Sequence, residues 1–102
     1  MRETALKSKV LKMLHAEYPE IWTYKSCDRF TAGIPDIIGC LPGGRMFAVE
    51  LKIKPNKATR LQDHVLGRIK RAGGIAGVCY SVDEVRNLIA GCEGSVVCSE
   101  NQ

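Results

Sequence analysis

Apolar residues recur along the chain at two different spacings, and the spacing predicts which segments are helices. Residues 3–16 repeat apolar side chains at the interval of a single helical face and stop before Tyr18-Pro19. Residues 60–72 show the same spacing and end at two glycines. A third helix is expected over residues 82–90. The second and third helices each follow a capping-box pattern, Thr59 with Gln62 and Ser81 with Glu84.

Between these helices lie short apolar or alternating runs that are typical of β-strands. We expect strands over 21–27, 36–41, 45–53 and 75–80. A Pro-Gly-Gly turn at residues 42–44 joins the second and third strands, which predicts a hairpin. The expected order is α-β-β-β-α-β-α, an α/β protein with a mixed β-sheet flanked by helices.

The length of 102 residues suits a single domain with a modest core. We expect that domain to span residues 1–102, with its core over about residues 3–90. The tail, residues 91–102, is poorly patterned, although Val96-Val97 can add a short strand. The segment Lys54–Ala58 between the third strand and the second helix is expected to be a mobile polar loop.

Positive charge is concentrated in the middle of the chain. The formal net charge is +4, but Arg45–Arg71 alone holds eight basic and two acidic residues. Such a basic segment suits a polyanion such as nucleic acid, and it is also compatible with an ordinary solvated face.

The third strand carries charge at its end. Because side chains alternate along a strand, Phe47, Val49 and Leu51 share a core face, whereas Glu50 and Lys52 project together from the other. Antiparallel pairing in the hairpin brings Asp36 close to Glu50. Two converging carboxylates suit Mg²⁺, and a neighbouring lysine can orient water or stabilise a phosphoryl centre. A plain ion pair at a sheet edge is the simpler interpretation.

Two further polar residues fall among apolar helix positions. Glu3 lies within the helical arc of apolar side chains, where it can either favour the helix N-terminus or add a carboxylate to the site. Gln62 lies inside the apolar face of its own helix, so it needs a polar partner. Its interpretations are the capping box and contact with the site. The apolar residues are Leu6, Val10, Met13 and Leu14 on the first helix and Leu61, Val65, Leu66, Ile69 and Ala72 on the second.

These residues carry a family resemblance. Pro35-Asp36, then Glu50-Leu51-Lys52, then Gln62 at a helix start resemble the PD-(D/E)XK nuclease superfamily. The stretches "GIPDIIGCLPGGRMFAVELK" and "LQDHVLGRIKRAGGIAGVCYSVDEV", together with the early Glu3, are similar to a stand-alone VRR-NUC domain, the virus-type replication-repair nuclease. The resemblance covers roughly Glu3 to Ile89.

The resemblance implies a restriction-endonuclease-like core and a metal-dependent endonuclease. Asp36 and Glu50 would bind Mg²⁺, for which Mn²⁺ can substitute, with the Leu51 carbonyl as a further ligand. Glu3 would extend the acidic cluster, Lys52 would position or activate water, and Gln62 would support the site. Stand-alone members resemble Holliday-junction resolvases of DNA repair, which implies a homodimer acting on branched DNA.

Other surface residues are candidates for nucleic-acid contact. Lys25, Ser26, Arg29 and Thr31 precede Asp36 and can either reach a phosphate or belong to a solvated loop. The loop with Lys54 and Lys57 is the better candidate for binding the phosphate backbone. His15 and His64 lack partners at ligand spacing, so we expect surface residues. For Trp22 and Tyr24, which share a strand face, we expect a core or dimer contact rather than base stacking.

The bulk features bear on the cellular compartment. No apolar run is long enough to cross a membrane, and MRETALKSKV is too polar for a signal peptide. Five cysteines without a C-x-x-C pair indicate reduced thiols rather than a zinc site. We therefore expect an intracellular protein, in the cytoplasm of a bacterium or a phage-infected cell.

The sequence leaves several functions open. The same chemistry can act on nicks, flaps or linear duplex instead of four-way junctions. The domain can also be a non-catalytic DNA-binding module, although retention of Asp36, Glu50 and Lys52 together argues against this. Because phosphodiester chemistry is shared, the residues do not separate DNA from RNA as the substrate.

Overall fold

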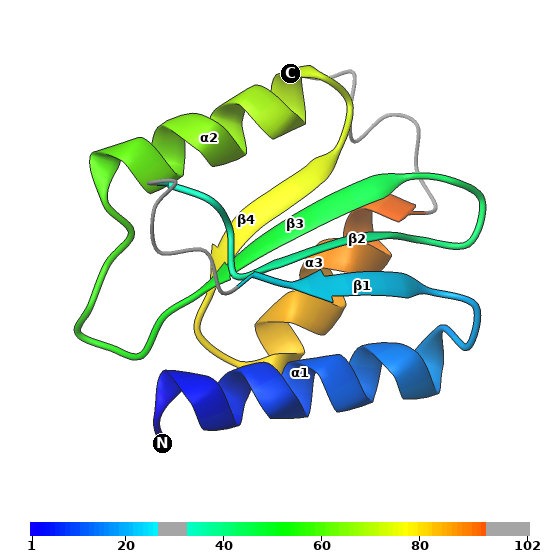
Figure 1. The fold of residues 1–102 in the computed structure, drawn as a ribbon, viewed down its shortest axis with the longest axis horizontal. Helices are drawn as coiled ribbons and strands as arrows, with labels where there is room; N and C mark the ends of the chain where they lie inside the picture. The colour runs from blue at the N-terminus through cyan, green and yellow to red at the C-terminus, as the bar shows by residue number, and fades with distance from the viewer. Residues whose placement is uncertain (27–32, 94–102) are drawn as a thin grey trace.

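The computed structural model describes residues 1–26 and 33–93, and within them it holds three helices and four strands (Figure 1). The order is the predicted α-β-β-β-α-β-α. The elements are α1 (Glu3–Glu17), β1 (Trp22–Lys25), β2 (Ile37–Cys40), β3 (Met46–Leu51), α2 (Arg60–Arg71), β4 (Ile75–Cys79) and α3 (Val82–Glu93).

The strands form one mixed sheet in the order β1-β2-β3-β4. The first three strands are antiparallel neighbours, and Ile37 pairs with Val49 in the β2–β3 hairpin. β3 and β4 run parallel because α2 carries the chain back between them. A crossover helix packs over the strands that it joins, so the connectivity itself places α2 over β3 and β4.

The helices divide unequally between the two faces of the sheet (Figure 1). α1 and α3 cover one face, and fourteen buried residues from the described part of the chain form the main core there. α2 lies on the other face, where a smaller cluster centres on Ala48, Leu66 and Ala76. The alternation predicted for β3 is confirmed, since Phe47, Val49 and Leu51 belong to the main core and Ala48 to the smaller one.

The helix starts follow the predicted capping boxes, one of them with a variation. The Thr59 hydroxyl accepts from the Gln62 backbone N–H, and the Gln62 side chain accepts from the Thr59 N–H. The Ser81 hydroxyl likewise accepts from the Glu84 N–H, but the Glu84 carboxylate accepts from the N–H of Tyr80, one residue earlier than the motif requires. At the end of α2, Gly73 adopts φ +103°, which a residue with a side chain rarely does.

The strands are shorter than predicted at their ends, and α3 is longer. The observed strand ends differ from the predicted ones because the hydrogen-bonded pairing stops before the apolar pattern does. Ile21 and Ile53 lie outside the strands and still pack on the core. α3 continues through Gly91 to Glu93, past its expected end at residue 90. The strand suggested at Val96-Val97 lies outside the described residues.

Burial differs from the sequence pattern at two places. For Trp22 and Tyr24 the core alternative is wrong, since they remain 59% and 52% exposed, and the dimer contact stays a prediction. The apolar face of α2 is also only partly buried, because Leu66 is buried whereas Leu61 and Ala72 are exposed. Both results follow from the position of α2, which does not extend over the β1 side of its own sheet face.

No helix in the described part of the chain is long and apolar enough to span a membrane. Of the cysteines whose side chains are described, Cys40 and Cys79 are both free thiols. Burial, with a smaller contribution from the charge of Glu84, raises the pKa of Cys79 to about 11 and keeps this thiol protonated.

Candidate active site

Charged side chains gather where β2 begins and β3 ends. Because Ile37 pairs with Val49, the register places Asp36 beside Glu50, as the hairpin predicts. The Ser26 N–H donates to the Asp36 carbonyl, which continues the β1–β2 pairing up to this point. Lys52 follows Glu50 on the same side of β3, and Gln62 approaches from α2. The structure thus brings Asp36, Glu50, Lys52 and Gln62 together.

Asp36 is held on both of its carboxylate oxygens. One oxygen, Oδ2, accepts a hydrogen bond of 2.8 Å from the backbone N–H of Leu51. The other, Oδ1, lies 3.7 Å from Nζ of Lys7 on α1. The side chain keeps 23% of its surface exposed, so it is fixed in position yet open to solvent.

Glu50 is the buried member of the pair, with only 3% of its surface exposed. Its Oε2 accepts from Nε2 of Gln62 at 3.0 Å and lies 3.6 Å from Nζ of Lys52. Its Oε1 is buried without any hydrogen-bond partner, the one such side-chain atom within the described residues. An unpaired buried carboxylate oxygen is costly, so this atom indicates a ligand that the protein alone does not supply.

The environment of Glu50 opposes its ionisation. Burial, followed by the negative charge of Asp36, raises the pKa of Glu50 from 4.5 to about 7, although Lys52 acts in the opposite direction. Perturbed carboxylates of this kind are frequent at functional sites. A bound cation would relieve both unfavourable effects.

Gln62 satisfies both interpretations that the sequence left open. Its Oε1 accepts from the Thr59 N–H at 2.8 Å, which closes the capping box. Its Nε2 donates to Glu50 at the same time. One side-chain amide therefore fixes the start of α2 and orients the buried carboxylate.

Lys7 is a member of the cluster that the sequence interpretation missed. Its side chain is 18% exposed and lies beside Asp36, so each carboxylate of the pair has its own lysine, Lys7 at Asp36 and Lys52 at Glu50. A signal existed: at 100° per residue Lys7 lies close to the arc that contains Leu14 and Glu3.

Two predicted ligands are less clearly placed. Glu3 is half-buried at the start of α1, but no described contact joins it to Asp36 or Glu50. Leu51 contributes its N–H to Asp36, and the role of its carbonyl stays a prediction. Within residues 1–26 and 33–93, no three His, Cys, Asp or Glu side chains converge as a metal site.

The donor set nevertheless fits Mg²⁺. This cation prefers oxygen ligands, retains several waters, and is commonly held by one or two carboxylates. Asp36 and Glu50 supply two carboxylates, one with an oxygen that lacks a partner. The pair has no sulfur or imidazole ligand that would favour zinc.

The predicted nucleic-acid contacts are scattered around this cluster. Lys25 is exposed on β1, but strand alternation places it on the α1 side of the sheet, away from Glu50. Ser26 is half-buried beside Asp36 through its backbone. Lys54 and Lys57 are exposed after β3, and Nζ of Lys54 lies 5.6 Å from the centre of the Tyr80 ring. Arg29 and Thr31 lie outside the described residues.

A comparison of shape decides the architecture. A solved structure named "VRR_NUC domain" matches the chain with a TM-score of 0.63 and 24% sequence identity, over 81% of this chain and 92% of the other. This chain has the fold of a VRR_NUC domain. No protein-family model and no curated protein sequence matches it. The VRR_NUC resemblance and the α/β fold class predicted from the sequence are thus confirmed at the level of the fold.

Proposed function

We propose that the protein is a metal-dependent endonuclease that hydrolyses DNA phosphodiesters, with Asp36, Glu50 and Lys52 at its catalytic centre. The observation that carries the proposal is Glu50, a buried carboxylate with one unpartnered oxygen beside a second carboxylate and a lysine. The VRR_NUC fold and the basic segment Arg45–Arg71 support a nucleic-acid substrate.

Asp36 and Glu50 would hold the cation, with the Leu51 carbonyl and Glu3 as further candidate ligands. A bound Mg²⁺ or Mn²⁺ would stabilise the negative charge that builds up on the phosphodiester in the transition state. Lys52 is 3.6 Å from Glu50 and has two further N–H donors to orient an attacking water or a phosphate oxygen. The Gln62 amide would hold the Glu50 carboxylate in position, and Lys7 would do the same for the Asp36 carboxylate.

The finer proposal concerns the substrate and the assembly. By its resemblance to stand-alone VRR-NUC domains, the protein would prefer four-way DNA junctions and act as a homodimer, so that two sites cut two strands. Lys25, Ser26, Arg29, Lys54 and Lys57 are its candidate contacts to the phosphate backbone. A cytoplasmic role in DNA repair is consistent with this chemistry.

The test is cleavage of a labelled four-way junction beside a linear duplex of the same sequence, with Mg²⁺ and with EDTA. The protein is compared with Asp36→Asn and with Asp63→Asn, a matched change at an exposed carboxylate on α2. We expect Asp36→Asn to lower the cleavage rate about a thousandfold or more, since it removes several kcal/mol of transition-state stabilisation. Asp63→Asn should cut like the parent.

Each outcome has a definite meaning. Paired symmetric cuts in the junction, dependent on metal, support the dimeric resolvase. Equal cutting of both substrates keeps the nuclease and removes the branch preference. Cleavage by Asp36→Asn at the parental rate contradicts the mechanism. DNA binding without any cleavage indicates a binding module.

A further inference from the structure

The sheet face that carries Glu50 is only half covered. α2 packs over β3 and β4 and its cluster reaches Ile38 of β2, and no helix within residues 1–26 and 33–93 covers the same face of β1. We call this surface the open face. Strand register and side-chain alternation assign its residues: Trp22, Tyr24, Ile38, Cys40 and Met46.

Two aromatic rings stand on the outer strand of the open face. Trp22 and Tyr24 have ring planes within 9° of parallel and centroids 6.5 Å apart. This separation is close to two residues of a strand, about 6.8 Å, so the rings project side by side from the sheet. Since both remain more than half exposed, each offers a flat apolar surface to a ligand.

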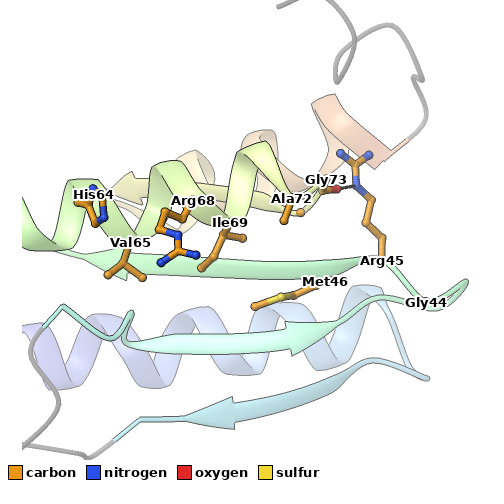
Figure 2. Close-up of a pocket in the computed structure, with 10 residues that line it drawn as sticks. Gly44, Arg45, Met46, His64, Val65, Arg68, Ile69, Ala72 and Gly73 are labelled. Carbon is orange, nitrogen blue, oxygen red and sulfur yellow. Dashed lines mark hydrogen bonds between the residues drawn. The ribbon is translucent and has the colours of Figure 1, made fainter.

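The opposite border of the open face is a groove beneath α2 with a volume of about 560 Å³ (Figure 2). Val65 and Ile69 project from the helix toward the sheet, and Met46 lies below them. His64 and Arg68 line the same groove from α2. Helix α2 carries four basic residues and one acidic residue, which favours an anionic ligand.

The open face and the candidate active site lie on the same side of the sheet. Tyr24 shares a row with Ile38 and Ala48, and the row of Asp36 and Glu50 is the next one on this face, about 7 Å along the strands. Trp22 lies one row further out, in line with Met46. The aromatic pair, the groove and the acidic cluster therefore lie on the same face of the sheet.

We propose that the open face binds a single strand of nucleic acid, with unpaired bases stacked on Tyr24 and Trp22 and phosphates following the α2 side toward Asp36 and Glu50. Exposed aromatic rings beside basic side chains are the means by which proteins bind single strands without reading their sequence. The inference rests on the proposed nuclease function and refines its substrate, since an unpaired stretch favours flaps over fully paired four-way junctions.

The chain supplies its own reporter, because Trp22 is its single tryptophan. The experiment follows Trp22 emission while an oligodeoxythymidine of about 12 nucleotides is added in EDTA, where no cleavage occurs. The matched probe is an abasic strand of the same length, which keeps the phosphates and lacks the bases. We expect the first to quench Trp22, and the second to bind weakly without quenching.

Variants assign the effect to the two rings. The affinity of each variant is measured with a labelled oligonucleotide. Trp22→Ala and Tyr24→Ala should each weaken binding at least about fivefold. Trp22→Phe and Tyr24→Phe keep a ring and should retain most of the affinity, which excludes misfolding as the cause. Thr23→Ala is the matched control, since Thr23 lies on the same strand but faces His15 of α1.

Three results would overturn the inference. Equal affinity for the abasic strand would mean that only phosphates are held. The face would belong to a second copy of the chain if two observations were made together. Trp22 emission would change with protein concentration, and sedimentation would show a dimer for the parent but not for Trp22→Ala. Because the titration is repeated with Asp36→Asn, its outcome is separate from that of cleavage: cutting without quenching keeps the nuclease and discards this surface.

Discussion

The two faces of the sheet are built from the same four strands but differ in burial and in chemical character. The face under α1 and α3 is sealed and apolar, and Gly39 there admits the Phe47 ring at a point where any side chain would overlap it. The face under α2 is half open and holds a buried carboxylate, a lysine and exposed aromatic rings. The comparison indicates that one face supplies stability and that the other gives up some of it for chemistry.

The largest expected loss of stability comes from a change in the sealed face. Phe47→Ala removes a fully buried ring and leaves a cavity, so it should lower the free energy of unfolding by about 3–5 kcal/mol. Its neighbour Met46, 41% exposed on the open face, is the matched change, and Met46→Ala should cost less than about 1 kcal/mol. Urea denaturation of both variants measures the contrast. Equal losses would show that the two faces do not differ in this way.

The next effect concerns the buried carboxylate. The folded chain holds the Glu50 proton more tightly, with a pKa of about 7 against an ordinary 4.5, so the stability that this residue contributes is present at low pH and is lost as pH rises through that interval. Without divalent cations, the free energy of unfolding of Glu50→Gln relative to the parent should rise by about 3 kcal/mol from about pH 5 to pH 8.

Urea denaturation at the two pH values, in EDTA, checks this prediction. Glu20→Gln, a change at an exposed residue, serves as the control and should follow the parent at both pH values. The Glu50→Gln protein should also be inactive as a nuclease, which would separate stability from function at one residue. An unchanged difference between pH 5 and pH 8 would contradict the account of Glu50.

A smaller effect is expected from the cation itself. Mg²⁺ at about a hundred times its dissociation constant should stabilise the folded parent by about 2.7 kcal/mol at pH 8, because on the proposed mechanism it would bind only where Asp36 and Glu50 are assembled. Thermal melting with and without Mg²⁺ measures the shift. The Asp36→Asn and Glu50→Gln proteins should show little of it, and an equal shift in all three would place the cation elsewhere.

The smallest effect separates helix capping from site support. Thr59→Ala removes one capping hydrogen bond and should cost about 1 kcal/mol with little change in cleavage rate. Gln62→Ala should cost a similar amount of stability and also slow cleavage about tenfold or more, because Glu50 loses its amide partner. Paired urea and rate measurements distinguish the two residues; identical rate losses would remove Gln62 from the site.

The sequence was sufficient for those features that depend on local rules. Apolar spacing and capping residues predict the order of the elements, and the short Pro-Gly-Gly turn fixes a hairpin register that places Asp36 opposite Glu50. The inward position of Gln62 indicated its double contact, because a polar residue on an apolar helix face needs a partner.

The sequence was not sufficient where the outcome depends on how whole elements pack. The angle of α1 across the sheet decides whether Glu3 or Lys7 meets Asp36, and no residue spacing contains that angle. Trp22 and Tyr24 have the alternation of a buried strand, but they are exposed because α2 covers only the two strands that it joins. Sequence periodicity predicts that a face exists, and topology decides whether anything covers it.

The double attachment of Gln62 links the candidate active site to the least stable part of a helix, its first turn. Helix ends fray at temperatures where the middle of a sheet is intact. When the first turn of α2 opens, Glu50 loses its amide partner although the core under α1 and α3 is unchanged. Enzymatic activity is therefore expected to decline on gentle warming before the chain melts, so that the capping turn sets the upper working temperature of the protein.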